Sequence, residues 1–323
     1  MCTAISVKLK SHYFGRNLDY EHTFGQSVII TPRRYVFNFL NGKVLKNHYS
    51  IIGIGLACEN YPLYFDCCNE KGLCMAGLNF PQNAVYNENK NNMENVASFE
   101  LLPFILSQCK DTKEAVLMLE NINITNKPFN EELLPTPLHW IVSDREKTIT
   151  LEQTKNGLKI YENSVGVLTN NPPFDVQMFN LSNYLNISPN QPQNNFSDKI
   201  TLTPYSNGMG AVGLPGDLSS ASRFVRSAFI ALNTCFDDDE YMAVNTFFHI
   251  LYSVYQQKGC VVTPNGLEFT NYSSCYNAEE GICYYTTYNN STINAVSVKK
   301  TDVEGEKLVL YNMIENGAFN LQN

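Results

Sequence analysis

The sequence lacks a long hydrophobic run. Its longest apolar stretch, Ile51 to Cys58, has eight residues, whereas a helix that crosses a bilayer needs about 18 or more. The first residues, Met1 to Lys8, show no basic region followed by an apolar segment and a small-residue cleavage site, so no secretory signal peptide is visible. We therefore expect a soluble, cytoplasmic protein with no membrane partner.

Clusters of basic residues are also scarce. Lys and Arg number 23 against 31 Asp and Glu, which gives a net charge of -8. The longest basic blocks are the pairs Arg33-Arg34 and Lys299-Lys300. Because binding to nucleic acid depends on cations concentrated against phosphates, we expect no nucleic-acid partner.

The cysteines show no spacing typical of a metal site. There is no Cys-x-x-Cys pair, and Cys67-Cys68 followed by Cys74 matches no zinc-ligand pattern. Since nothing indicates export to an oxidising compartment, we expect reduced cysteines, most of them buried as small apolar side chains. The histidines show no metal spacing either. We predict no metal and no other cofactor.

Signatures of other enzyme classes are absent or out of context. The segment Gly208 to Gly213 has the glycine spacing of a dinucleotide-binding loop, but Pro215-Gly216 follows it where a helix should begin. We interpret it as a glycine-rich loop. Neither a Gly-x-Ser-x-Gly elbow nor the cysteine context of papain-like proteases is present.

What the sequence does contain is strands towards both ends, with helices between them. Alternating or β-branched runs predict strands over 27–31, 50–58, 73–78, 139–143, 148–153, 281–288, 292–298 and 307–311. Helical spacing predicts a helix over 111–122, capped by Asp111, and two helices within 219–257 that are interrupted near 235–238. This order favours an antiparallel α+β fold over alternating βαβ units. We expect one domain over residues 1–323.

Cys2 carries most of the chemical information. Methionine aminopeptidases generally remove Met1 when a small residue follows, which would leave a thiol and a free α-amino group on one residue. An α-amino group titrates near ~7.7–8.0 and a thiol near ~8.5, so the pair can exchange a proton at little cost. Such an amine can activate an N-terminal nucleophile. Taken alone, however, a second residue more often belongs to a frayed, inert terminus.

The segment that follows gives Cys2 a charged partner. Residues 2–9 and 13–20 have the pattern of two strands around a turn at Lys10-Ser11. A two-residue loop there pairs Cys2 with Asp19. A carboxylate beside an α-ammonium group is a suitable orienting group.

Arg16 is a second charged candidate in the same strand. A guanidinium near the sulfur would lower the pKa of the thiol and favour thiolate. Alternation along the strand points Arg16 and Asp19 to opposite faces. A bend or bulge, for example at Gly15, is therefore required if both serve the site.

Five motifs follow one another along the chain. They are Met1-Cys2-Thr3-Ala4, Phe14-Gly15-Arg16-Asn17-Leu18-Asp19, Gly77-Leu78-Asn79-Phe80-Pro81, Leu168-Thr169-Asn170-Asn171-Pro172, and Gly213-Leu214-Pro215-Gly216-Asp217 with Ser222-Arg223-Phe224. Together they resemble the cholylglycine hydrolase family of bile salt hydrolases and penicillin V acylases, most closely the Gram-positive bile salt hydrolases. The resemblance covers essentially the whole chain. It implies an N-terminal nucleophile hydrolase fold, an αββα four-layer sandwich of two antiparallel sheets, usually assembled as a homotetramer.

The resemblance also implies a catalytic role for six residues. Cys2 would be the nucleophile, Arg16 would stabilise the thiolate, Asp19 would hold the α-amino group, Asn79 and Asn170 would supply donors around the oxyanion, and Arg223 would order the network. Without the family, Asn79 and Asn170 would be interpreted as turn residues. Composition alone does not choose between Arg223 and Arg226, one helical turn later.

The expected substrate is a conjugated bile acid. Having Asn at position 79 makes this sequence resemble the bile salt hydrolases, whereas many penicillin V acylases look as though they carry Tyr at that position. An apolar acyl group needs an apolar wall, for which the candidates are Tyr20, Phe24, Tyr61, Leu63, Tyr64 and Phe65. Residues 61–65 are equally well explained as an ordinary core strand.

The resulting hypothesis is hydrolysis of the amide that joins a bile acid to glycine or taurine, through a thioester on Cys2. The alternative with the same mechanism is an acylase for penicillin V or N-acyl-homoserine lactones. A glutamine amidotransferase would also use an N-terminal Cys, but it would need a further domain for which this chain has no room. A non-catalytic binding protein with the same fold is the alternative outside enzymes.

Overall fold

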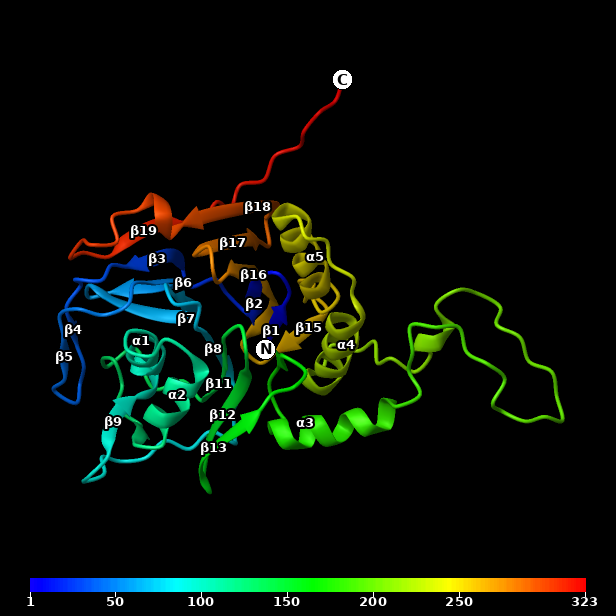
Figure 1. The fold of residues 1–323 in the computed structure, drawn as a ribbon, viewed down its shortest axis with the longest axis horizontal. Helices are drawn as coiled ribbons and strands as arrows, with labels where there is room; N and C mark the ends of the chain where they lie inside the picture. The colour runs from blue at the N-terminus through cyan, green and yellow to red at the C-terminus, as the bar shows by residue number, and fades with distance from the viewer.

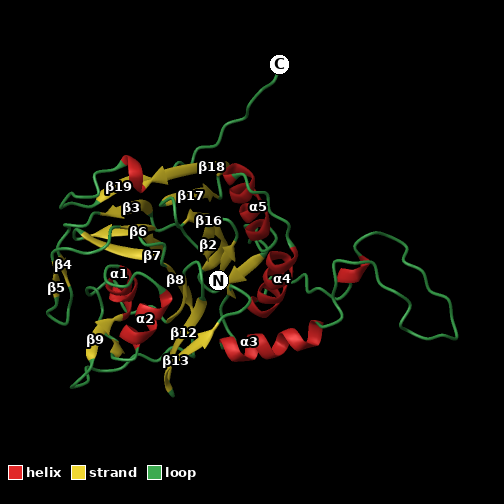
Figure 2. Cartoon of the chain, viewed as in Figure 1, coloured by secondary structure: helices red, strands yellow, loops and turns green.

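Residues 1–323 are described by a computed structural model in which two large antiparallel sheets lie face to face (Figures 1 and 2). In spatial order, the first sheet contains β14 (Val167–Leu168), β1 (Cys2–Lys8), β2 (His12–Tyr20), β16 (Gly266–Asn277), β17 (Ile282–Thr287) and β18 (Asn290–Ser297), with β15 (Val261–Thr263) paired to β16. The second contains β13 (Gly157–Glu162), β12 (Thr148–Thr154), β11 (Leu138–Ser143), β8 (Cys74–Asn79), β7 (Tyr61–Asn69), β6 (Ile51–Cys58), β3 (Ser27–Thr31) and β19 (Val309–Asn312). Two small sheets join β4 (Phe37–Asn38) to β5 (Val44–Leu45), and β9 (Glu94–Ala97) to β10 (Ile122–Thr125).

Helices cover the outer faces of both sheets. α1 (Leu101–Leu106) and α2 (Thr112–Leu119) pack on the second sheet, while α4 (Ser220–Asn233) and α5 (Glu240–Tyr252) pack on the first (Figure 1). The remaining helix, α3 (Phe174–Leu181), precedes α4 in the chain and contacts it. The layers therefore follow the order αββα that the family resemblance implied, and the fold is antiparallel α+β as the order of the elements predicted.

Alternation along β1 explains why the sheets are apolar on both faces. Ala4 belongs to the core between the two sheets, whereas the next residue, Ile5, packs with Phe247 and Phe248 of α5. Side chains two residues apart share a face, so Cys2 lies on the same inner face as Ala4. The nucleophile candidate is thus fixed in the layer between the sheets, and it is only 6% exposed.

Most of the predicted elements are confirmed. The strand over 27–31 coincides with β3, and Asp111 caps α2 by accepting from the Glu114 N–H at 2.9 Å. Two helices with a break near 235–238 are also present as α4 and α5. The predicted helix over 111–122 extends too far, because Ile122 already begins β10. The Gly208 to Gly213 segment contains only a short 3₁₀ turn, as expected for a loop.

Two cysteines contradict the expectation of reduced thiols. Cys68 on β7 and Cys74 on β8 form a disulfide. They are directly opposite each other in the antiparallel ladder, with Cα atoms 4.0 Å apart. The pairing of the strands, rather than the six-residue spacing in sequence, brings the sulfurs together. The expectation that most cysteines are buried is confirmed.

A buried polar cluster connects the two sheets near the end of β1. Ser6 Oγ lies 3.0 Å from His12 Nε2 and 2.7 Å from Ser143 Oγ, and Ser143 belongs to the opposite sheet. Burial lowers the pKa of His12 to about 4. His12 is therefore neutral in the folded protein at neutral pH.

The lowered pKa of His12 predicts a loss of stability in mild acid. An unfolded His titrates near ~6.5, so below that pH the unfolded state binds a proton that folded His12 refuses. From this group alone, the free energy of unfolding should fall by about 2 kcal/mol between pH 7 and pH 5. Urea denaturation at both pH values, for the parent and a His12→Asn variant, measures it. The variant should lose about 2 kcal/mol less than the parent, and an equal loss in both would contradict the assignment.

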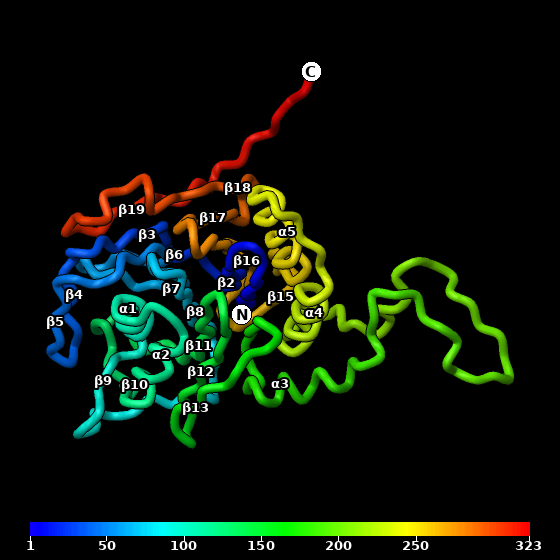
Figure 3. Tube along the Cα trace, viewed as in Figure 1, coloured from blue at the N-terminus to red at the C-terminus, as the bar shows by residue number.

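Residues between α3 and α4 extend away from the two-sheet body (Figure 3). This excursion, residues 185–217, carries large apolar side chains in solvent, including Leu185 (83% exposed), Phe196 (81%) and Tyr205 (86%).

The longest helix, α4, has 14 residues, and no helix is long and apolar enough to span a bilayer.

Candidate active site

The hairpin that carries Cys2 has a different register from the predicted one. Cys2 pairs with Leu18, and Lys8 pairs with His12 across a three-residue turn over 9–11. The predicted pairing of Cys2 with Asp19 is therefore wrong by one position. The cause is the extra turn residue, since loop length sets the register of a hairpin.

Arg16 and Asp19 point to opposite faces of β2, and no bulge at Gly15 brings them together. Gly15 pairs regularly with Ile5 and Cys275, and the irregularity lies instead in β16, between Thr270 and Tyr272. A Cβ at Gly15 would lie 1.9 Å from the Ser274 carbonyl oxygen. The glycine serves close strand packing and not a bend.

Arg16 lies on the same inner face as Cys2. Its Nη1 donates to the carbonyl oxygens of Phe65 (3.1 Å) and Gly77 (2.6 Å) on the second sheet, and the side chain is fully buried. Burial lowers the pKa of Arg16, but the facing Cys2, Tyr272 and Asp66 raise it by more, so the net pKa is above its ordinary value. Arg16 is a permanent cation beside the Cys2 thiol.

Asp66 is a buried carboxylate close to Arg16 that the sequence did not single out. It accepts hydrogen bonds from the hydroxyls of Tyr272, Ser274 (2.7 Å) and Tyr276 (2.8 Å). Burial raises the pKa of Asp66, while Arg16 and the three hydroxyls act in the opposite direction. Asp66 thus balances the charge of Arg16 without contacting the thiol.

Asp19 faces α4 and not the sulfur. Its Oδ1 accepts from Thr270 Oγ1 at 2.6 Å, and its Oδ2 lies 4.0 Å from Arg223 Nη1. Burial raises the pKa of Asp19, whereas Arg223 and the terminal amine act to lower it. Its backbone carbonyl accepts from the Met1 ammonium at 2.9 Å. Asp19 therefore reaches the chain terminus through its main chain.

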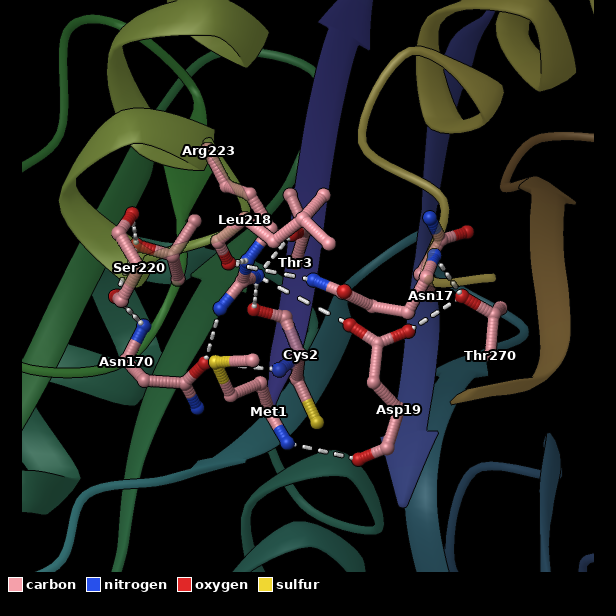
Figure 4. A network of polar contacts seen from close by, with 12 residues as sticks. Met1, Cys2, Thr3, Asn17, Asp19, Asn170, Leu218, Ser220, Arg223 and Thr270 are labelled. Atoms are coloured by element: carbon pink, nitrogen blue, oxygen red, sulfur yellow. Dashed lines mark hydrogen bonds and ion pairs between the residues drawn. The ribbon is translucent and has the colours of Figure 1, made fainter. Parts of the chain in front are cut away.

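The nitrogen of Cys2 is held by Asn170 (Figure 4). It donates to Asn170 Oδ1 at 2.8 Å, and Asn170 Nδ2 donates in turn to the carbonyl of Asn79 at 2.7 Å. The Asn170 N–H donates to Ser220 Oγ at 2.8 Å, at the start of α4. The structure therefore brings Cys2, Asn79 and Asn170 together, although they lie on three separate segments.

Arg223 connects this group to α4. It donates to the Cys2 carbonyl (2.5 Å), Thr3 Oγ1 (2.6 Å) and Asn170 Oδ1 (2.8 Å), and it is fully buried (Figure 4). Burial lowers the pKa of Arg223. Arg226 lies outside the network and donates to the carbonyls of Pro215 and Ser253. The structure thus distinguishes the two arginines that composition could not.

Three of the aromatic candidates form one cluster. The ring of Phe24 lies 4.8 Å from that of Tyr20 and 5.5 Å from that of Phe65, and all three pack against the core that holds Cys2. His22, which the sequence did not suggest, lies 4.9 Å from the rings of both Tyr20 and Phe24.

Tyr61 lies elsewhere, against Phe37, Phe99 and Phe129 on the helix-covered face of the second sheet. Tyr64 packs in the same cluster. In a regular strand Tyr61 and Phe65 would share a face, because they are four residues apart. The β6–β7 pairing shifts register at Phe65, since Ile54 pairs with Asp66 and Gly55 with Tyr64, and this irregularity puts Phe65 on the inner face and Tyr61 on the outer one. The structure therefore does not bring Tyr61 to the site.

Residues 2–311 match the family model described as "Linear amide C-N hydrolases, choloylglycine hydrolase family". The chain belongs to this family. It is 50% identical to a bile salt hydrolase/transferase of Lactiplantibacillus plantarum, with 96% of each chain covered. It is 39% identical to one of Clostridium perfringens, again with 96% of each chain covered.

Solved structures confirm the N-terminal nucleophile hydrolase fold of this choloylglycine hydrolase family member. A variant of conjugated bile acid hydrolase from Clostridium perfringens superposes with a TM-score of 0.92 at 37% identity, over 100% of both chains. Penicillin V acylase from Agrobacterium tumefaciens reaches 0.78 at 18% identity, over 98% of this chain and 95% of that one. At that identity the second likeness shows the fold alone.

Proposed function

We propose that this protein hydrolyses the amide bond of glycine- or taurine-conjugated bile salts, with Cys2 as the nucleophile after removal of Met1. The main structural support is the position of Cys2 at the start of β1. There it lies beside the buried Arg16, and its nitrogen donates a hydrogen bond to Asn170 Oδ1. The 50% identity to a bile salt hydrolase/transferase over 96% of the chain supports the substrate class.

Activation of the thiol is the first step of the proposed mechanism. The free α-amine of Cys2 takes the thiol proton, and Arg16 stabilises the resulting thiolate because the two share a low-dielectric interior. Asn170 keeps hold of the nitrogen through its Oδ1. Arg223 donates to the backbone carbonyl of Cys2, so both the nitrogen and the carbonyl of Cys2 are held.

The thiolate then attacks the amide carbonyl of the substrate. Donors from Asn79 and Asn170 hold the developing oxyanion, a contribution of roughly 2.7–4 kcal/mol per donor in other hydrolases. The C–N bond breaks, the α-ammonium returns its proton to the leaving nitrogen, and the acyl group remains on Cys2 as a thioester. Water, deprotonated by the same amine, then attacks the thioester and releases the bile acid and the thiol.

The apolar acyl group is assigned to the cluster of Tyr20, Phe24 and Phe65. Aromatic walls of this kind bury large apolar ligands while a few polar groups fix their orientation. Asp19 holds Arg223 in place in this scheme. Tyr61 is left out of the wall because it lies on the far face of the second sheet.

Release of the amino acid tests the function directly. Purified protein incubated with glycocholate or taurocholate should release glycine or taurine, and penicillin V should be cleaved far more slowly. Brisk cleavage of penicillin V without release from either bile salt would refute the bile salt assignment and leave an acylase with the same nucleophile.

We also propose a cytoplasmic homotetramer. The excursion over 185–217 supports the assembly, because exposed Phe196 and Tyr205 would be covered by another subunit. Light scattering after size exclusion should give four times the mass of one chain, and charged substitutions at both positions should reduce it. A monomeric mass for the parent would refute the tetramer, and cell fractionation tests the compartment.

A further inference from the structure

Glu268 is a buried carboxylate beside the amino terminus that the proposed mechanism does not use. It lies on β16 and is 5% exposed. Its Oε1 lies 2.8 Å from the Met1 ammonium, which also donates to the Asp19 carbonyl at 2.9 Å. These two oxygens form a small site that holds one positive charge just before the start of β1.

Removal of Met1 transfers this positive charge to Cys2. Consecutive residues are spaced about 3.8 Å apart, so the new ammonium group lies within reach of the same site. The hydrogen bond from the Cys2 nitrogen to Asn170 Oδ1 can remain, because this side-chain oxygen already accepts from that nitrogen in the longer chain. Glu268, in contrast, loses the cation that it contacts in the longer chain, and a buried carboxylate without a counter-ion is strongly disfavoured.

The other charged groups around Glu268 already have partners. Asp19 is paired with Arg223 and Thr270, and Glu21 accepts from Thr263 on β15. Arg223 is committed to the carbonyl of Cys2 and to Asn170.

The phenol of Tyr20 is the remaining titratable group that faces Glu268, and its pKa is raised by burial and by nearby carboxylates. It is therefore neutral at neutral pH. Arg223 also acts to lower the pKa of Glu268, but the terminal ammonium is the cation that contacts its carboxylate, and after removal of Met1 that ammonium belongs to Cys2.

We propose that Glu268 is a positioning residue whose carboxylate holds the Cys2 α-ammonium and sets the pH range over which the amine and thiol exchange a proton. The inference rests on the proposed function only in requiring Cys2 as the first residue. Burial raises the pKa of Glu268 and the terminal ammonium lowers it, in keeping with such a pair.

The sign of the effect follows from charge alone. A nearby negative charge favours the protonated forms of both the amine and the thiol, so it raises both apparent pKa values of the coupled pair. Replacing Glu268 by a neutral residue removes that charge. Both limbs of the pH profile should then move to lower pH, by about 1 unit.

The test compares Glu268→Gln, Glu268→Ala and Glu268→Asp with the parent, each cleaved from a tag so that Cys2 is the first residue. Intact mass verifies the new terminus. Glu162→Gln is the matched control, because Glu162 is exposed and pairs only with Lys147 on the second sheet. The first readout is the rate of Cys2 alkylation by iodoacetamide against pH, followed on the N-terminal peptide by mass spectrometry. The second is kcat/KM for glycocholate against pH.

The two neutral variants should show the shift in both readouts. Glu268→Asp should return the profile towards that of the parent, and Glu162→Gln should leave it unchanged. A parent-like alkylation profile in either folded neutral variant would overturn the inference. A shifted alkylation profile together with no hydrolysis of glycocholate by any of the proteins, the parent included, would uphold the role of Glu268 and refute the proposed function.

Discussion

A Cys2→Ala variant should release glycine from glycocholate at least about 10⁴-fold more slowly than the parent, and it should still fold. The Cys2 sulfur is the atom that forms the thioester, so its removal leaves the proposed mechanism without a nucleophile. Because the variant removes only one buried sulfur atom, the loss of unfolding free energy should be about 1 kcal/mol. Steady-state assays and urea denaturation measure the two effects.

Cys109→Ala is the matched control for this experiment. Cys109 is also a buried free cysteine, but it packs with α1 and α2 on the outer face of the second sheet. Its replacement should cost a similar amount of stability and leave kcat/KM within about twofold of the parent. Retention of full activity by Cys2→Ala would refute the mechanism, whatever the behaviour of the control.

The sequence predicts many of the strands because they alternate or are rich in β-branched residues, but it gives none over β13 or over β16, the longest strand. It misses α1, whose residues Leu101 to Leu106 are all buried. A helix that is apolar on every side has no amphipathic periodicity to detect. α1 is also only six residues long, which makes it resemble a buried strand in sequence.

The register of the first hairpin shows a different limit. A turn of two residues or three changes which residue faces Cys2, and Leu9 could belong equally well to the strand or to the turn. The structure resolves this by pairing Lys8 with His12. As a result, Asp19 acts through its backbone and through Arg223, and Asn170 takes the position next to the Cys2 nitrogen.

Asp66 and Glu268 could not be found from local pattern. Glu268 meets the terminus only because β16 pairs with β2, which joins residues about 250 positions apart. Asp66 meets the hydroxyls of Tyr272 and Tyr276 across the gap between the two sheets. Neither contact leaves a signal in spacing or composition. The five motifs group Cys2, Asn79 and Asn170, which hydrogen bonds connect in the structure, because a family resemblance brings a spatial arrangement with it.

A chain that keeps a residue before Cys2 should be inactive, although its thiol is intact. With Met1 in place, the nitrogen of Cys2 belongs to an amide that donates to Asn170 Oδ1 and cannot accept the thiol proton. The terminal ammonium lies instead between Glu268 and the carbonyl of Asp19. Figure 4 shows its hydrogen bond to the Asp19 carbonyl. Loss of the general base alone costs about 10²–10⁴-fold in rate. We therefore expect a loss of at least about 10²-fold.

This prediction is best measured on one preparation before and after cleavage. A tagged chain with a protease site directly before Cys2 should hydrolyse glycocholate at the background rate, and cleavage should restore the rate of the processed parent. The same tag on Cys2→Ala should give no activity on either side of cleavage. Equal activity before and after cleavage, with the extra residues still present by intact mass, would show that the base is not the α-amine. Some other group near Cys2 would then have to accept the thiol proton.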